Sequence, residues 1–326
     1  MGPLMQGVLT ILIGVFGCIG YFYASNIVLD RVIFPPRHDD AGRNINRANA
    51  VRPWLFLFPA LFALTLYLVY PVVGSFIRSM YDRTGDTFIG FQNYQNLAGD
   101  PEFRSAVFNN LLWVLVVPAA ATFLGLVIAQ LTDRLKWGGI AKSLIFMPMA
   151  ISFVGASLIW KFVYANDASI GMLNAVRLFF GADGPIDPLQ VPFWNNFFLM
   201  VILVWIQTGF AMVILSAALR GIPEETIEAA ILDGANPFQI FFKIQVPQIM
   251  GTILVVWTTI TILVLKVFDI VYTMTGGNFG TQILPSYMME YMFRDDGRAT
   301  AVALVIMVLV LPVMIWNIRQ ARKEMR

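Results

Sequence analysis

Residues that commonly perform covalent or metal chemistry are scarce in this sequence. It contains one cysteine, Cys18, and one histidine, His38, which are too few for a disulfide framework or a Cys/His zinc site. No group of His, Cys or paired carboxylates marks a reactive centre, and the phosphate-binding patterns GxxxxGKS and GxxxxGKT do not occur. The sequence therefore predicts that this chain is not an enzyme and holds no metal or cofactor.

Polar side chains within long apolar segments are the remaining candidates for binding a ligand. Such groups are costly at membrane depth and usually face a cavity or another helix. They are Gln207, Thr208, Thr258, Thr259, Thr261, Lys266 and Asp269. Because Lys266 and Asp269 are spaced i, i+3, they could form an ion pair on one helical face or could contact a ligand.

The segment Arg220–Gln248 is amphipathic and is predicted to lie outside the apolar spans. Pro223 suits the first turn of a helix, and the acidic residues that follow it are favoured there by the helix dipole. The Asp-Gly-Ala-Asn-Pro run at 233–237 then predicts a sharp corner, since Gly can take the left-handed conformation and Pro ends a helix. A second short helix should follow, with an apolar face that needs a partner. This face consists of Phe238, Phe241, Phe242 and Val246.

The composition indicates which elements must position these residues. Of 326 residues, 58% are hydrophobic and 13% are charged, whereas a soluble domain carries about 25% charged residues. A soluble fold could not bury that much apolar surface, and the net charge of +2 is too small to indicate nucleic-acid binding. We therefore predict an all-α integral membrane protein.

Seven apolar windows are long enough, or nearly so, for one membrane-spanning helix each. They are Met1–Leu29, Pro53–Ile77, Ser105–Thr132, Ser143–Trp160, Pro188–Leu219, Ile244–Leu265 and Ala299–Ile318. Small residues in the third and fourth windows would allow helix backbones to approach closely, although membrane helices are generally rich in such residues. They are Ala119, Ala120, Ala121, Gly125, Gly155 and Ala156.

The basic residues between these windows predict the orientation of the chain. The loop Asp30–Arg52 contains five of the 22 Lys and Arg residues and should be cytoplasmic by the positive-inside rule. Counting onward places Arg220–Gln248 and the C-terminus on the same side. A cleaved signal peptide is the alternative interpretation of the first window, but that window lacks a basic start and exceeds the roughly 7 to 15 residues of a signal core.

One pattern in the cytoplasmic segment resembles a known motif. Glu228, Ala229 and Ala230 are followed after three residues by Gly234, and nine residues later by the sequence Ile-Gln-Val-Pro at 244–247. This spacing resembles the EAA loop of binding-protein-dependent ABC importer permeases. The one departure is Val246, where that family usually has Leu.

The resemblance implies a type I ABC importer (MetI-like) permease fold in a bacterial inner membrane. Residues 1–52 would be an N-terminal anchor with a basic loop, and residues 53–326 the permease domain. The loop at 220–248 would form coupling helices that dock into a groove on a cytoplasmic ATPase subunit. The coupling residues would be Glu228, Ala229, Ala230, Asp233, Gly234, Pro237, Phe238, Ile244 and Pro247.

The resemblance also implies the partners. They are a second homologous permease, two ATPase subunits that bind ATP and Mg²⁺, and an extracytoplasmic sugar-binding protein, all assembled in the lipid bilayer. A pair of amphipathic helices that merely lies on the lipid surface is the alternative interpretation of the loop.

Two further segments, Phe88–Asn110 and Leu265–Gly277, resemble the sugar permeases of the maltose and glycerol-phosphate type, and the complete pattern is most similar to alpha-glucoside permeases. Maltose, sucrose or trehalose would then be the substrate class. Gln207 and Phe210 correspond in location, though not in residue type, to sugar-contacting positions of the maltose permease. The expected substrate path consists of Gln207, Phe210, Thr258, Thr259, Thr261, Lys266 and Asp269.

Several alternatives stay open from the residues alone. Trp257, Phe268 and Tyr272 could stack against sugar rings or belong to the core. A secondary sugar transporter would need intramembrane carboxylates and commonly an internal repeat, and Asp269 is the one plausible carboxylate. The sequence does not identify the sugar.

Overall fold

The computed structural model describes residues 2–35, 41–133 and 135–324, so His38 and Arg134 lie outside the described residues. Across these ranges the chain is helical, and its one extended pairing is an isolated bridge between Tyr81 and Phe88. The prediction of an all-α protein is confirmed.

The chain forms two compact units, Met1–Gly74 and Ser75–Arg326. In the first unit, α1 (Pro3–Ile27) packs against α2 (Ala41–Leu64), and the Tyr21 hydroxyl donates to the Leu55 carbonyl at 2.8 Å. The Arg52 guanidinium binds both carboxylate oxygens of Asp30 at 2.7 and 2.9 Å. The π-helical stretches Val28–Ile33 and Thr65–Val69 extend these helices, and α3 (Tyr70–Arg78) follows. This division does not test the predicted domain boundary at residue 52, which stays a prediction.

Five helical segments are long and apolar enough to cross a membrane, and two bent helix pairs raise the number to seven if each pair is one span. The single segments are Met5–Ile33, Ala41–Arg78, Pro101–Asp133, Trp194–Arg220 and Asp296–Trp316. This agrees with the prediction of about seven spans. The expectation of one helix in each window was wrong for the fourth and sixth windows, where the helix is interrupted.

The fourth window is divided into α6 (Gly138–Phe146) and α7 (Phe153–Val163), which meet at 105°. A short 3-10 helix, Met147–Ala150, contains Pro148 and ends α6, and the Ser152 hydroxyl then caps α7 by accepting from the Gly155 N–H at 3.1 Å. The sixth window begins inside a bent pair, because the segment Pro237–Gln248 meets α13 (Met250–Val264) at 70°. Apolar composition alone does not report such bends.

The core of the second unit is the contact between α5 (Pro101–Asp133) and α9 (Trp194–Arg220). A Cβ atom added at Gly125 would lie 2.5 Å from the Ala211 Cβ and 2.8 Å from the Met212 nitrogen. One Cβ added at Gly209 would lie 2.6 Å from the Ile145 carbonyl oxygen. These glycines therefore set how closely α5, α6 and α9 approach one another.

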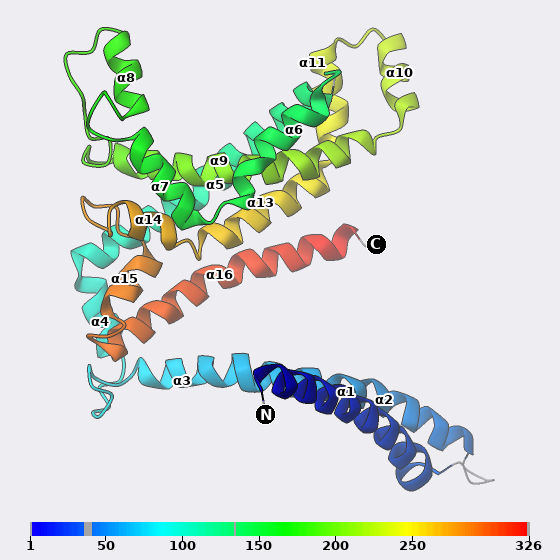
Figure 1. Cartoon of the computed structure of the whole chain (residues 1–326). Coiled ribbons are helices and arrows are strands. Elements are labelled where there is room, and N and C mark those ends of the chain that lie inside the picture. The colour runs from blue at the N-terminus through cyan, green and yellow to red at the C-terminus, as the bar shows by residue number, and fades with distance from the viewer. Residues whose placement is uncertain (1, 36–40, 134, 325–326) are drawn as a thin grey trace. The chain divides into compact units, whose positions relative to one another are not determined.

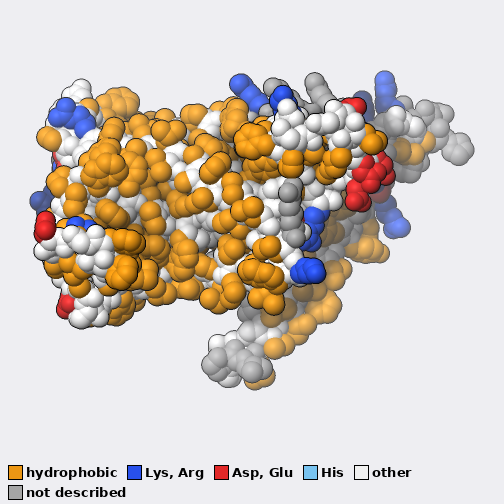
Figure 2. Space-filling view, turned by 90° about the horizontal axis from the view of Figure 1, so that it is seen from above, with side chains coloured by type: hydrophobic (Ala, Val, Ile, Leu, Met, Phe, Trp, Pro, Cys, Tyr) orange, Lys and Arg blue, Asp and Glu red, His pale blue; other side chains and the backbone are white. Residues whose placement is uncertain are grey.

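The shorter helices lie at the two ends of the second unit (Figure 1). One end carries α4 (Gln92–Gly99), α8 (Met172–Phe179), α14 (Asp269–Met274) and α15 (Leu284–Tyr291). The other carries α10 (Glu224–Leu232), α11 (Pro237–Ile240) and the C-terminal end of α16 (Asp296–Glu324). Between them, apolar side chains cover the face seen in Figure 2, and charged side chains gather at both ends.

The end that carries α4 and α15 is held together by a partly buried polar contact. The Tyr287 hydroxyl donates to the Asp100 carboxylate at 2.9 Å, and the Arg298 guanidinium bonds to both groups. Arg298 also lies 4.1 Å from the centre of the Tyr291 ring. This contact joins the beginnings of α5 and α16 to α15.

Replacing Gly125 with Ala should separate α5 from α9, because the added methyl group has no space against Ala211. Overpacking of this kind costs about 1–3 kcal/mol, so the melting temperature of the purified protein should fall. The matched control is Gly139→Ala on α6, where a Cβ atom meets nothing within 4 Å. Equal melting temperatures for the two variants would contradict the proposed contact.

Candidate functional site

The predicted helix–corner–helix of Arg220–Gln248 is present. Pro223 precedes α10, whose first turn carries Glu224 and Glu225 where the helix dipole favours negative charge. Gly234 has a φ of +81°, a conformation that side chains rarely adopt, and the Ala235 N–H donates to the Ala230 carbonyl at 2.9 Å across it. The corner is therefore a left-handed cap that depends on glycine.

A capping box begins the second short helix. The Asn236 side chain accepts from the Gln239 N–H at 2.8 Å, and the Gln239 side chain accepts from the Asn236 N–H at 2.9 Å. Pro237 occupies the first turn. The helix then continues as a π-helical stretch, Phe241–Gln245, and ends with α12, Val246–Gln248.

The expectation of one apolar face on this second helix was wrong. Phe241 and Val246 pack against the core, whereas Phe238 is 72% exposed and Phe242 is 46% exposed. Phe238 and Phe242 are four residues apart and share one side, whereas Phe241 and Val246 are five residues apart, the spacing that the wider turn of a π-helical stretch brings onto one side. The exposed face is a Phe238–Phe242 pair with ring centres 4.4 Å apart.

The predicted coupling residues divide into exposed and inward positions. Exposed are Glu228, Ala229, Asp233, Gly234, Pro237, Phe238 and Pro247. Ala230 is buried and Ile244 is half-buried, so these two hold the loop to the rest of the unit. Leu232, which we did not predict, is 88% exposed. The sequence feature that could have identified Leu232 is an apolar residue at the end of α10, one turn after Glu228.

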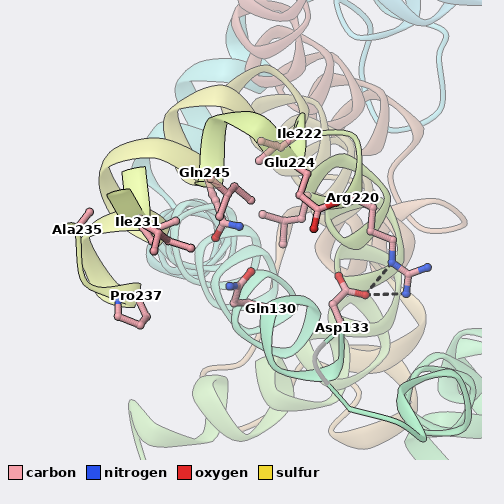
Figure 3. A pocket seen from close by; sticks show the side chains of 12 residues that line it. Gln130, Asp133, Arg220, Ile222, Glu224, Ile231, Ala235, Pro237 and Gln245 are labelled. Atoms are coloured by element: carbon pink, nitrogen blue, oxygen red, sulfur yellow. Dashed lines mark hydrogen bonds and ion pairs between the residues drawn. The ribbon is translucent and has the colours of Figure 1, made fainter. Parts of the chain in front are cut away.

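A network of charged residues lies where this loop joins the spans. The Asp133 carboxylate, at the end of α5, accepts from Arg220 Nε at 2.9 Å and Nη2 at 2.7 Å, as the dashed lines in Figure 3 show. It also accepts from the Ser216 hydroxyl at 3.0 Å and forms an ion pair with Lys142 on α6. Asp133 therefore links α5, α6 and α9 at the end of the spans where the loop begins.

Beside this network is a cavity of about 780 Å³ between the ends of α5 and α9 and the loop helices. The amides of Gln130 and Gln245 point into it from opposite sides (Figure 3). Ile231 and Pro237 line its outer part. This cavity separates the loop helices from the ends of α5 and α9, and the outer surfaces of the loop helices are exposed.

A second cavity, of about 400 Å³, lies at the break between α6 and α7. It is lined by Met149, Ile151, Ser152, Phe153, Val154, Ile206, Gln207, Leu263 and Asp269. Gln207 is only 4% exposed, yet its amide makes no hydrogen bond within the described residues, and the same is true of the half-buried Asp269 carboxylate. Two unpaired polar groups facing one apolar cavity can bind the hydroxyl groups of a ligand.

The other predicted path residues do not line this cavity. The hydroxyls of Thr208, Thr258, Thr259 and Thr261 donate to carbonyls one turn earlier in their own helices. Phe210 is half-buried and packs against the core. Phe268 and Tyr272 stack on each other at 4.8 Å, and Trp257 is half-buried on α13.

The predicted alternative of an ion pair between Lys266 and Asp269 was wrong. In the part of the chain that the structure describes, no ion pair joins these two side chains. α13 ends at Val264 and α14 begins at Asp269, so the two residues do not share a helix. Lys266 is exposed in the connection, which leaves the Asp269 carboxylate free to face the cavity.

Replacing Asp133 with Asn should destabilise the junction between the spans and the loop, because Lys142 and Arg220 lose their shared counter-charge. Losing hydrogen bonds to a charged group of this kind costs on the order of 2 kcal/mol. Thermal unfolding in detergent should show a lower melting temperature. Asp183→Asn, at an exposed carboxylate in another loop, is the control and should melt with the native protein.

Comparison with known proteins identifies the family. Residues 103–324 match the family described as binding-protein-dependent transport system inner membrane component. The chain is 61% identical to the alpha-glucoside transport system permease protein AglF of Rhizobium meliloti, over 99% of each chain. It is 48% identical to the osmoprotective compounds uptake permease protein GgtC of Synechocystis, over 83% of this chain and 99% of that one.

The fold is also similar to that of solved importers. One chain from the crystal structure of a bacterial ABC transporter involved in the import of the acidic polysaccharide alginate superposes with a TM-score of 0.71, at 19% identity over 87% of this chain and 99% of that one. At this identity the likeness shows the fold alone. Together with the family match, these findings show that the chain belongs to the inner membrane permease components of binding-protein-dependent ABC importers.

Proposed function

We propose that this chain is a permease subunit of an ATP-driven importer for alpha-glucosides of the maltose, sucrose or trehalose class. The observation that carries the proposal is the 61% identity, over 99% of both chains, to a permease named for alpha-glucoside transport. The aligned region covers 99% of this chain and therefore includes the cavity and the loop as well as the spans.

The partners follow from the chemistry that this chain lacks. ATP hydrolysis, with its Mg²⁺, would take place on two separate cytoplasmic ATPase subunits, and this chain would have no enzymatic role. A second homologous permease would complete the translocation path, and an extracytoplasmic sugar-binding protein would deliver the substrate. One solved relative of similar fold is a bacterial alginate ABC transporter in complex with a pentasaccharide-bound periplasmic protein, which supports this kind of assembly.

The loop would transmit movement from the ATPase to the spans. Its exposed Phe238, Leu232 and Glu228 offer apolar and acidic contacts to a docking groove. The C-terminal end of α16 lies at the same end of the unit as α10 and α11 (Figure 1), which supports the cytoplasmic placement of both. Force on the loop would pass through the Asp133 network into α5, α6 and α9.

Helix α9 would connect this movement to the substrate. Gln207 in the cavity and Arg220 in the Asp133 network lie on the same uninterrupted helix, separated by roughly 20 Å at 1.5 Å per residue. The Gln207 amide and the Asp269 carboxylate would bind sugar hydroxyls, and the apolar wall would contact the ring faces. Movement of α9 would then change access to the cavity, as alternating access requires.

Replacing Gly234 with Val should abolish ATP-dependent uptake of labelled maltose, sucrose and trehalose by vesicles that contain the complete complex. Val strongly disfavours the positive φ of this corner, so the second loop helix would leave its position relative to α10. The control Gly139→Val lies in open space and should transport normally. Co-purification of the ATPase separates lost coupling from lost assembly, and undiminished uptake would contradict the proposed role of the loop.

Replacing Gln207 with Leu should lower the maximal uptake rate roughly fivefold, the equivalent of losing one hydrogen bond of about 1 kcal/mol to the sugar in the membrane. The measurement uses saturating binding protein, so that delivery does not limit the rate. Thr259→Val is the matched control, because that hydroxyl is exposed on α13 and does not line the cavity. Equal uptake rates for the Gln207→Leu and Thr259→Val variants would show that the sugar does not bind at Gln207.

A further inference from the structure

Helix α8 exposes an apolar face and turns its polar residues inward. Met172 is 62% exposed, Val176 is 50% exposed and Phe179 is 85% exposed. Ala175 and Phe180 are also exposed, so the outward residues follow the i, i+3, i+4, i+7, i+8 pattern of one helical face without any polar side chain. A helix on a water-exposed loop normally has the opposite arrangement.

The inward face of α8 satisfies the polar groups of its own loop. Asn174 is fully buried, and its amide donates at 2.8 Å to the carbonyls of Ala165 and Ile186 while accepting from the Ile186 N–H at 2.8 Å. Arg177 is half-buried and donates to the Gly184 carbonyl at 3.1 Å. Internal pairing of this kind is what a segment needs where water is scarce.

The neighbours of α8 continue its apolar surface. Phe162, at the end of α7, is 66% exposed, and at the start of α9 Phe193 is 55% exposed and Trp194 is 57% exposed. The centre of the Phe193 ring lies 5.7 Å from that of Trp194 and 5.3 Å from that of Phe197. An exposed Trp such as Trp194 at the end of a span is typical of the boundary between lipid and water. α8 therefore lies in the connection between α7 and α9, near exposed aromatic side chains at the ends of both helices.

The direction of α8 fits the same boundary. It runs crosswise to α9 at the end of the unit opposite α10 and α11 (Figure 1). A helix that lies across the spans runs along the membrane surface, which is the position of interfacial amphipathic helices. Figure 2 shows apolar side chains extending from the middle of the unit towards this end.

We propose that α8 is an interfacial helix that inserts its Met172–Val176–Phe179 face among the lipids of the outer leaflet. Lipid fits this face better than a protein partner, because the face has no polar side chain to form the hydrogen-bonded rim that protein interfaces carry. It also lies near the exposed aromatic residues at the ends of α7 and α9. The proposal depends on the membrane location of the family and, for the choice of leaflet, on the proposed cytoplasmic placement of the loop, but not on which sugar is carried.

Lipid contact can be measured with a fluorescent label on the complete complex in lipid nanodiscs. Cys18→Ser removes the one native cysteine of this chain, and Phe179→Cys then takes an environment-sensitive dye. A complex that carries Cys18→Ser alone gives the background from dye on the partner subunits. A spin-labelled lipid, with the label near the headgroup end of the acyl chain, should quench this dye several-fold more than a dye at the control Asp183→Cys, an exposed position in the same loop. Aqueous iodide should quench the two dyes in the reverse order.

Two results would overturn the proposal. Strong iodide quenching at Phe179→Cys would place the face in water. A dye that neither lipid nor iodide quenches would show that a protein covers the face. Met172→Cys repeats the measurement at the other end of α8 in case a label at residue 179 disturbs the helix. Sugar uptake plays no part in this readout, so failure of the transport assay would not affect it.

Discussion

The close packing of α9 against α5 is the contact on which the rest of the second unit depends. At Gly125 the two helices are so near that one additional carbon atom would collide with Ala211 and with the backbone beyond it. Lipid chains are as apolar as the helix surfaces, so association in the membrane comes from such close contacts rather than from apolar burial alone. α9 is thereby fixed against α5 over its length, and both the cavity and the loop take their positions from it.

The interrupted spans follow from a second constraint. Backbone groups at membrane depth must be hydrogen-bonded within the protein or face a cavity, since the lipid core offers no partners. The break between α6 and α7 and the connection between α13 and α14 border the cavity that Gln207 and Asp269 line. The chain therefore loses helical structure beside these two unpaired polar groups, and it stays regular in α5 and α9.

The sequence predicted the parts of this arrangement that depend on local chemistry. The Glu-rich start of α10, the Gly234 corner and the placement of Gln207 and Asp269 by a cavity could all be inferred from residue types and spacing. It did not predict the bends, because apolar composition is the same in a straight and a broken span. It also did not predict the Asp133 network, because Ser216 and Arg220 lie 83 and 87 residues from Asp133 along the chain. The split of the Phe face required a π-helical stretch, which has no sequence signature that we recognised.

The short helices α8 and α10, which precede and follow α9, differ in the polarity of their exposed side chains. This difference indicates the surroundings of each end of α9. α10, after Arg220, exposes carboxylates beside the apolar Leu232, a mixture suited to a protein groove in water. α8, before Trp194, exposes apolar side chains alone and hides Asn174 and Arg177. α9 and the connection at 180–193 join them, so movement imposed on the loop end must be resisted or guided at the other end. An anchor in the outer leaflet would hold that end of α9 in place, so that force at the loop would tilt α9 together with the closely packed α5 around the anchor instead of shifting the whole unit.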